Sequence, residues 1–426
     1  MLTQGWDTVS AASVDAVNHV LQADPRMVLT SFSFSLPAPA DYRGDGQFGP
    51  WRIVPGGSGQ LLHIELPITS GTLTKGTGAA VPIAGLSAVV EVALELLPSR
   101  TQTGDRDLRF TMNSVGDQPG RTGPGVVTPI RLDDPAKKLG FEAGAVLLAA
   151  IAAALAQHGG SVAWIFATVG PVTGTDSWLS PSASGFCYYE SAAGGYLAVF
   201  NLTGGTDIAA LPRKVEPALV AGGPAAAFAF SRELFLRHVI APKLPDSFGH
   251  GTNAATFRFE PSDSSIVNTG RIPTDSVKSG AIWYDPYIDG LKITVEGSTL
   301  VTSVHGSCDM GLGITMTFAV QSRNETSVDT ATGTMTFRRD ANPTTHHEAS
   351  IPWYDWFLGP IPDLVMAIVV PIVADSIADG LNAHASAAPI ENIGDLSIHW
   401  TGFEKFHATA AGLNDSFYLK GDVATT

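Results

Sequence analysis

Apolar and polar residues alternate with a period of two in several segments of this chain. The clearest segments are 32–36, 62–68, 90–96, 108–112 and 314–320. Such alternation predicts half-buried antiparallel strands, each with one apolar face and one polar face. We therefore expect a protein that is rich in β-structure.

Helical spacing of apolar residues occurs in fewer places. Residues 1–21 are expected to form a helix with apolar positions at Trp6, Val9 and Val17, capped by Asp7 or Thr8. A shorter helix is predicted over 231–240, with Ser231 as its N-cap.

Two longer helices are predicted over 136–157 and 364–383. Their apolar residues recur at steps of three or four: Leu147, Ile151 and Leu155 in the first helix, and Met366, Val370, Val373 and Ile377 in the second. Pro371 lies inside the second ladder, so that helix either kinks there or has Pro371 in its first turn.

The order of predicted elements repeats between the two halves of the chain. Each half has a helix, several strands, a long apolar helix and a further strand, at 162–169 or 398–400. The junction at 221–224 (AGGP) is rich in residues that break helices and strands. We expect an α+β protein with two similar modules, 1–220 and 225–426, each with a long apolar helix wrapped by a highly curved antiparallel sheet. A single large α+β sandwich is the alternative.

The charge balance narrows the classes of partner. The 426 residues carry a formal net charge of −15. Nucleic-acid binding and electrostatic docking on anionic membranes are therefore not expected. The apolar runs at 143–156 and 364–374 are shorter than the roughly 20 residues that span a bilayer. The beginning of the chain lacks the apolar region of a secretory signal. We expect a soluble protein without a transmembrane segment, either cytoplasmic or released without a Sec signal peptide.

Motifs for catalysis or metal binding are weak. The sequence lacks G-x-S-x-G, Walker A and HExxH motifs. His346 and His347 are adjacent and are interpreted as part of a solvated turn, and Cys187 and Cys308 as separate reduced thiols. Glu91 and Glu95, about 13 Å apart along one strand, are expected to face solvent. We therefore expect no enzymatic activity, no cofactor and no metal, with a β-rich hydrolase as a third hypothesis.

Several short segments carry a resemblance to a known family. They are Gly5-Trp6-Asp7, Gly49-Pro50-Trp51 before a glycine turn at 56–59, Trp178-Leu179-Ser180-Pro181 after the strand at 162–169, and the stretch 230–248. In order and spacing the chain resembles the OrfX-type accessory proteins of clostridial neurotoxin gene clusters, which include a forty-seven-kilodalton member. These proteins belong to the tubular lipid-binding (TULIP) superfamily.

The resemblance implies a non-enzymatic protein that binds a lipid or another apolar ligand between helix and sheet, as an accessory or insecticidal-type component of a bacterial toxin gene cluster. The residues expected to line the tube are Phe32, Phe34, Leu147, Ile151, Leu155, Met366, Val370, Val373 and Ile377. The alternative is a protein-interaction scaffold with a filled core that assembles with sister cluster proteins. Alanines around the first long helix leave room for a slot, but a close approach of the sheet fills the same space.

Two aromatic segments permit two interpretations. Trp353, Tyr354, Trp356 and Phe357 form the more aromatic one, and the other spans 283–287. Each either contacts a membrane interface, where Trp and Tyr favour half-hydrated positions, or closes the core of its module.

Overall fold

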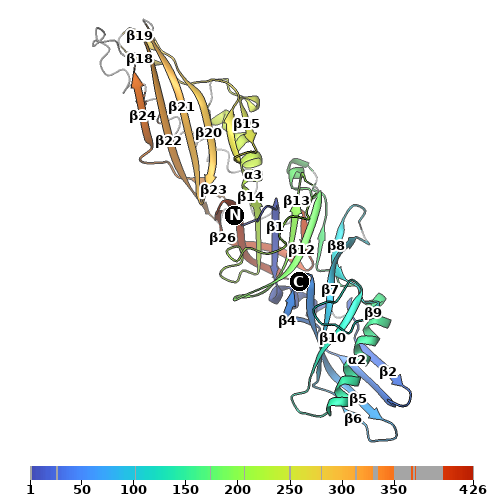
Figure 1. Cartoon of the computed structure of the whole chain (residues 1–426). Coiled ribbons are helices and arrows are strands. Elements are labelled where there is room, and N and C mark those ends of the chain that lie inside the picture. Colours follow the sequence, from blue (N-terminus) through green and yellow to red (C-terminus); the bar gives the residue numbers. More distant parts are fainter. Residues whose placement is uncertain are drawn as a thin grey trace. The chain divides into compact units, whose positions relative to one another are not determined.

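The chain divides into two compact units. Unit 1 comprises Met1–Thr8, Ala229–Ile393 and Ala408–Lys420, and unit 2 comprises Val9–Phe228, Gly394–His407 and Gly421–Thr426. The computed structural model (Figure 1) describes residues 2–24, 27–100, 102–172, 174–205, 207–248, 251–279, 281–311, 314–329, 334–349, 366–367, 370 and 397–425. The sequence-based division between 220 and 225 lies a few residues before the longest continuous segment of unit 1. That the two parts share one fold stays a prediction.

Unit 2 contains a large sheet with the strand order β2-β3-β5-β7-β8-β11-β25, and β4, β6, β9 and β10 join it off this path. Its strands pair in the antiparallel sense except β9 and β10, which are parallel to each other. Its strands are β2 (Ser31–Leu36), β3 (Tyr42–Phe48), β4 (Arg52–Ser58), β5 (Leu61–Lys75), β6 (Val81–Pro82), β7 (Ser87–Pro98), β8 (Arg106–Phe110), β9 (Ser114–Val115), β10 (Val126–Asp133), β11 (Ala167–Val169) and β25 (Ile398–Trp400). The predicted alternating segments 32–36, 62–68, 90–96 and 108–112 lie largely within β2, β5, β7 and β8. The period-two signal was therefore a correct guide to these strands.

Unit 1 contains a second sheet, of order β15-β16-β20-β21-β22-β23, with β17 and β24 paired off this path. Its strands are β15 (Phe257–Glu260), β16 (Ser265–Asn268), β17 (Ile272–Pro273), β20 (Pro286–Glu296), β21 (Thr299–Gly311), β22 (Ile314–Asp329), β23 (Thr334–Phe337) and β24 (Thr344–Ala349). A short hairpin of β18 (Val277–Ser279) and β19 (Ile282–Tyr284) pairs only within itself among the described strands. Within β22, buried and exposed residues alternate as predicted from 314–320.

A further sheet has the order β12-β13-β1-β14-β27-β26. Its strands are β1 (Thr8–Ser13), β12 (Ala183–Ser191), β13 (Gly194–Leu202), β14 (Ala226–Ser231), β26 (Phe403–Leu413) and β27 (Ser416–Thr425). The chain passes from one unit to the other within β1, β14, β26 and β27.

The N-terminal helix begins later than the sequence predicts. Residues 8–13 form the strand β1, and the helix α1 spans Val14–Ala23, with Ser13 as its N-cap. The Ser13 hydroxyl accepts a 3.1 Å hydrogen bond from the amide of Ala16. The first five residues of β1 are buried. The pairing of this small-residue strand within a sheet therefore outweighed its weak helical spacing.

The other helices follow the sequence more closely. The long helix α2 spans Phe141–Gln157 and lies inside the predicted range 136–157. Ser231 caps α3 (Arg232–Leu234), which continues as a π-helix over Phe235–Ile240. A 3-10 turn (Ala241–Lys243) and α4 (Leu244–Phe248) follow, and further 3-10 turns span Gly159–Ser161, Gly174–Leu179 and Ala254–Thr256.

The second predicted long helix, 364–383, lies mostly outside the described residues. Of its residues Met366, Ala367 and Val370 are described, and they are helical. Among the described residues, no helix is long and apolar enough to cross a membrane.

The two strands that were predicted to follow the long helices are paired with each other. Only Ala167–Val169 of the expected strand 162–169 is formed, as β11, whereas β25 matches the expected range 398–400. Ala167 lies opposite Trp400, and Val169 lies opposite Ile398. The segment Gly394–His407 is thus part of unit 2, although the sequence pattern placed it in the second module.

Candidate functional site

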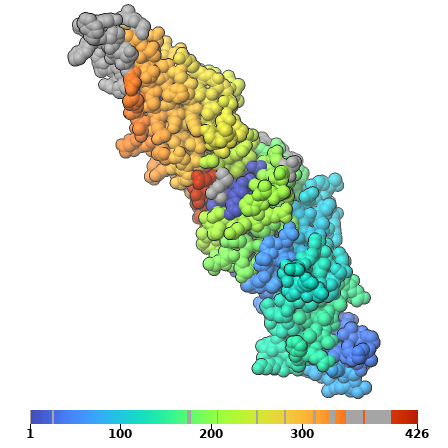
Figure 2. Space-filling model, viewed as in Figure 1, coloured from blue at the N-terminus to red at the C-terminus, as the bar shows by residue number. Residues whose placement is uncertain are grey.

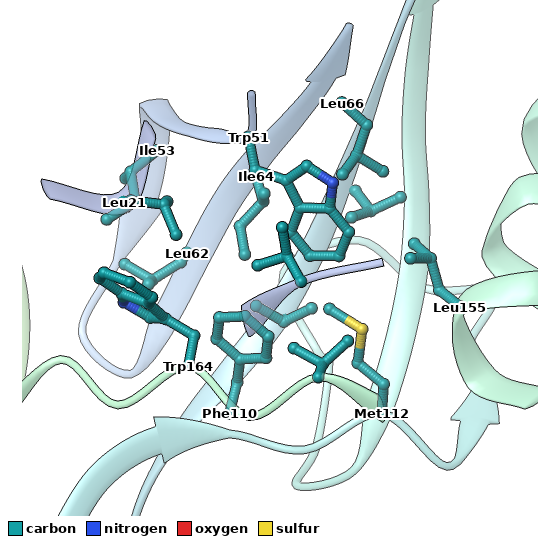
Figure 3. Packing of buried hydrophobic residues seen from close by; sticks show 14 of the residues in the cluster. Leu21, Trp51, Ile53, Leu62, Ile64, Leu66, Phe110, Met112, Leu155 and Trp164 are labelled. Carbon is teal, nitrogen blue, oxygen red and sulfur yellow. The ribbon is translucent and has the colours of Figure 1, made fainter. Parts of the chain in front are cut away.

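The core of unit 2 is closely filled where α2 meets the sheet. Leu147, Ile151 and Leu155 of α2 are each 0% exposed and belong to one cluster with the apolar faces of β4, β5, β7 and β8. Figure 3 shows Leu155 projecting from its helix toward this cluster, which includes Trp51 and Leu66. Burial of each such side chain contributes about 1.5–3 kcal/mol. The sheet packs closely against this end of the helix. Here the space beside the helix is filled by side chains, which was the alternative to a ligand slot.

The N-terminal half of α2 is packed differently. Phe141, the first residue of the helix, is 95% exposed, and Ala145 is also exposed. Gly144 faces β10, where a methyl group added to the glycine would lie 3.5 Å from Cδ2 of Leu132, an ordinary van der Waals distance. The helix therefore rests on β10 through small residues, and its outer side at this end is uncovered.

A surface pocket of about 320 Å³ lies along this end of α2 and is called the α2 groove below. Figures 1 and 2 show α2 and β10 in adjacent teal and green colours at one end of unit 2. Its apolar lining is contributed by Ile130, Leu132, Leu139, Phe141, Ala145 and Leu148. The arrangement supplies a mostly apolar concave surface of the kind that binds small apolar ligands.

Two charged residues, Arg131 and Asp134, also line the α2 groove. Arg131 forms an exposed ion pair with Asp133, with Nε 3.1 Å from Oδ1. Asp134 Oδ2 accepts a 2.8 Å hydrogen bond from the amide of Leu139. Backbone hydrogen bonds, that from Leu139 first, lower the pKa of Asp134. The carboxylate therefore holds the loop before α2 in place, and the Arg131 guanidinium is the cation available at the rim.

A salt bridge stands beside the first turn of α2. Lys75 Nζ lies 2.8 Å from Glu142 Oε1, and both side chains are mostly exposed. A carboxylate in the first helical turn is favourable because it faces the positive end of the helix dipole. Gly140, the N-cap residue, supplies no side-chain hydrogen bond to the helix.

Two of the other predicted lining residues, Phe32 and Phe34, do not line the α2 groove. Phe32 and Phe34 lie on β2, where their rings stack with centroids 6.5 Å apart. Phe32 lies opposite Gly46 of β3, and Phe34 lies opposite Gly44. Phe32 also packs on Phe48 at 4.9 Å. These rings cover the glycines of the neighbouring strand and belong to the packing of the sheet.

The predicted lining residues of the second half are only partly described. Met366 is buried and Val370 is half-buried. Val373 and Ile377 lie outside the described residues, as do Trp353, Tyr354, Trp356 and Phe357. Their assignment to a tube lining or a membrane contact therefore stays a prediction.

Ala145 is one of the alanines that were expected to leave room for a slot, but the other residues that line the α2 groove were not predicted. The sequence holds only a weak indication of these residues. Ile130 and Leu132 are apolar residues two apart along β10, and Phe141 is a large apolar residue at the start of an alanine-rich helix. Periodicity identified the buried side of α2, because that side repeats every three or four residues. It did not distinguish the uncovered first turns.

Glu91 corrects an expectation from the sequence. It was expected to face solvent, but it is 3% exposed. Its carboxylate accepts hydrogen bonds from the Thr122 hydroxyl at 2.6 Å and the Gly120 amide at 2.8 Å, and lies 3.1 Å from His63 Nε2. The loop between β9 and β10 therefore covers the polar face of β7.

Other acidic and histidine-containing positions have partners close by. Glu95 Oε1 accepts a 2.5 Å hydrogen bond from Thr111. His346 and Glu348 are exposed on β24, with His346 Nε2 3.2 Å from Glu348 Oε1. The turn that was predicted here is therefore a strand. Within the described part of the chain, no group of three or more His, Cys, Asp or Glu side chains is arranged to hold a metal ion. Cys187 and Cys308 are buried and free.

Comparison with known proteins places this fold in a family. The OrfX-like family, described as Protein OrfX2/OrfX3/P47, matches residues 3–402. The chain therefore belongs to the OrfX-like family, and the resemblance seen in the sequence is confirmed at this level.

Individual relatives match over most of the chain. Protein P47 of Clostridium botulinum (strain Kyoto / Type A2) is 25% identical over 435 residues, covering 99% of this chain and 100% of the relative. Protein OrfX3 of Paraclostridium bifermentans is 22% identical over 347 residues, covering 73% of this chain and 70% of the relative. The solved structure of P47 from Clostridium botulinum A2 covers 99% of this chain and 98% of its own, with a TM-score of 0.81 and 23% identity. The β-rich architecture with few helices is thus shared with P47.

Proposed function

We propose that this protein is a non-enzymatic carrier or receptor for an acyl lipid or a similar apolar ligand, which it binds in the α2 groove. The observation that carries this proposal is the uncovered apolar surface of α2, with Phe141 95% exposed beside a pocket of about 320 Å³. A volume of this size lies at the lower end of the range for small-molecule pockets.

The binding energy would come from the hydrophobic effect. Each buried methylene contributes about 0.8 kcal/mol, so ten methylenes contribute about 8 kcal/mol before the costs of association and ordering. Arg131 at the rim suits an acidic head group, because its guanidinium is paired only with the exposed carboxylate of Asp133 among the ion pairs of the described residues. A surface groove, rather than an internal tube, fits the full burial of Leu147, Ile151 and Leu155.

The proposal extends to the second module and to the biological setting. It retains the TULIP-type arrangement of two modules expected from the sequence, although most of the second predicted long helix, 364–383, lies outside the described residues. Membership of the OrfX-like family supports a role as an accessory or insecticidal-type component of a bacterial toxin gene cluster, alongside sister cluster proteins. The absence of enzymatic activity is part of the proposal, and it is supported by the engagement of the Glu91 carboxylate in structural hydrogen bonds.

Native mass spectrometry of the purified protein, followed by solvent extraction and lipid identification, tests the proposal. We expect a co-purified acyl lipid, or uptake of one from mixed lipids, at near-stoichiometric amount. A chain that stays bare after incubation with mixed lipids contradicts lipid binding and favours the interaction scaffold. Hydrolysis of the added lipid contradicts the non-enzymatic part.

A further inference from the structure

The β18–β19 hairpin of unit 1 exposes large apolar side chains at its tip. Ile282 is 57% exposed and Trp283 is 61% exposed. Ser279 pairs with Ile282, and the two residues between them in the sequence, Gly280 and Ala281, are small. In the sequence, residues 279–283 carry no charge and end in two bulky apolar residues, Ile282 and Trp283.

The base of the same hairpin is firmly attached to unit 1. Val277 and Tyr284 lie opposite each other and are 1% and 3% exposed. Below them, Ser276 donates a 2.5 Å hydrogen bond to Asp285 Oδ1, and the Thr274 amide and hydroxyl both donate to the carbonyl of Pro286. Figure 1 shows β18 and β19 beside one end of the long strands β21 and β22. The exposed pair is therefore presented by an ordered support, which lowers the entropic cost of binding.

A cation lies against the exposed tryptophan of the hairpin, as in an interfacial anchor. Lys278 lies opposite Trp283, and its Nζ is 5.4 Å from the centre of the ring. Outside the hairpin, Cζ of Arg271 lies 5.6 Å from the centre of the Tyr287 ring in β20, and the same guanidinium forms an ion pair with Asp289. Trp and Tyr favour the boundary between lipid head groups and hydrocarbon, and Lys and Arg place their charges in the head-group layer while their stems cover apolar surface.

We propose that the β18–β19 hairpin anchors this protein to the surface of a zwitterionic lipid bilayer, with Ile282 and Trp283 inserted at the interface. This inference does not depend on ligand binding in the α2 groove, which lies in the other unit.

The charge of the region selects the kind of membrane. Residues 271–289 contain two basic residues and three aspartates, Asp275, Asp285 and Asp289, and the whole chain carries −15. An anionic bilayer therefore offers no electrostatic gain, and attachment relies on apolar insertion. A phosphatidylcholine surface meets this requirement, because it bears no net charge.

Flotation of the full chain with phosphatidylcholine vesicles tests the anchor. We expect binding that changes little with salt concentration. We also expect a loss of about tenfold or more in the partition coefficient for Trp283→Ser and for Ile282→Ser, because each removes an apolar side chain that would insert into the bilayer. Val115→Ser is the matched control, because it removes an exposed apolar side chain of the other unit that does not line the α2 groove. It is expected to leave vesicle binding unchanged.

Quenching of tryptophan fluorescence by brominated lipid tests the anchor without a serine variant. Phosphatidylcholine brominated in its acyl chains is expected to quench part of the tryptophan emission, and Trp283→Phe is expected to remove that quenched part while retaining vesicle binding. The proposal is overturned if Trp283→Ser binds vesicles as the wild type does. It is also overturned if the wild type binds only phosphatidylglycerol-containing vesicles. The same holds if Trp283→Ser dissociates a dimer of the chain and does not weaken vesicle binding.

Discussion

The indole Nε1 of Trp400 donates a 3.0 Å hydrogen bond to the hydroxyl of Ser10, across 390 residues of sequence and in the interior of unit 2. Both residues are buried. Trp400 ends β25, and Ser10 lies in the middle of β1. The contact fixes the late segment Gly394–His407 to the first strand of the chain.

Removing one partner of this contact is expected to destabilise unit 2. Ser10→Ala leaves the Trp400 N–H buried without its acceptor, at a cost of about 1–3 kcal/mol in the free energy of unfolding. The thermal unfolding midpoint should fall. Trp400→Phe removes the donor, and the double variant should lose less than the sum of the two single losses. Strictly additive losses would contradict the coupling.

Gly46→Ala is expected to disturb the packing of β2 on β3. The added methyl group would lie 2.7 Å from Cζ of Phe32 and 3.0 Å from the carbonyl oxygen of Ser70. Overpacking of this kind costs about 1–3 kcal/mol. Urea unfolding measures the loss.

Phe32→Leu is the matched background for that test, because it removes the outer ring atoms that meet the new methyl group. Gly46→Ala should then cost clearly less in the Phe32→Leu protein than in the wild type. An equal cost in both backgrounds would show that the ring does not constrain residue 46.

Acid is expected to weaken unit 2 partly through Glu91. Burial alone raises the pKa of this carboxyl, but the hydrogen bonds from Thr122, Gly120 and His63 outweigh it, and the pKa lies below the ordinary value of 4.5. A carboxyl with a depressed pKa in the folded state stabilises the fold above its unfolded pKa, and this contribution is lost as the pH falls through the folded value. The stabilisation is therefore complete above about pH 4.5 and declines below it.

Thr122→Val checks this assignment. It removes the 2.6 Å hydrogen bond to Glu91 and should raise the folded-state pKa of the carboxyl toward its unfolded value, so that the acid-induced loss of stability becomes smaller and ends at a higher pH. Glu91→Gln should flatten the pH dependence of the unfolding free energy between about pH 3 and 5. An unchanged pH profile in both variants would rule out a contribution from Glu91.

The two thiols are expected to resist modification in the folded protein. Burial raises the pKa of Cys187 to about 12. Burial, with the charges of Asp285 and Asp309, raises the pKa of Cys308 to about 11. Since the thiolate is the reactive form, iodoacetamide at pH 8 should label neither cysteine until the protein is unfolded. Rapid labelling of either residue in the native state would contradict this burial.

The sequence predicted the elements whose residues contact partners on one face only. Ile314, Met316 and Phe318 alternate with polar residues and form a strand whose burial alternates in the same way. Leu147, Ile151 and Leu155 recur every four residues and form the buried side of α2. Local periodicity is enough in such cases, because it reports which face of an element is covered.

Prediction was wrong where long-range pairing decides the outcome. Residues 8–13 are a strand because of their place within a sheet, and Glu91 is buried because a distant loop covers it. The pairing of β11 with β25 could not be read from local patterns, since the partners are separated by more than 200 residues of sequence. The same holds for the α2 groove, which lies where the first turns of α2 rest on β10 through small residues and leave Phe141 exposed.

A pair of alanine-to-phenylalanine variants on α2 tests the central claim most directly. Ala145 lines the α2 groove, whereas Ala153 is another exposed alanine about two turns further along the helix and outside the groove. In a titration with a fluorescent fatty acid, Ala145→Phe should fill the groove and weaken binding at least about tenfold, and Ala153→Phe should leave it unchanged. Equal binding by both variants and the wild type would contradict a ligand site beside α2.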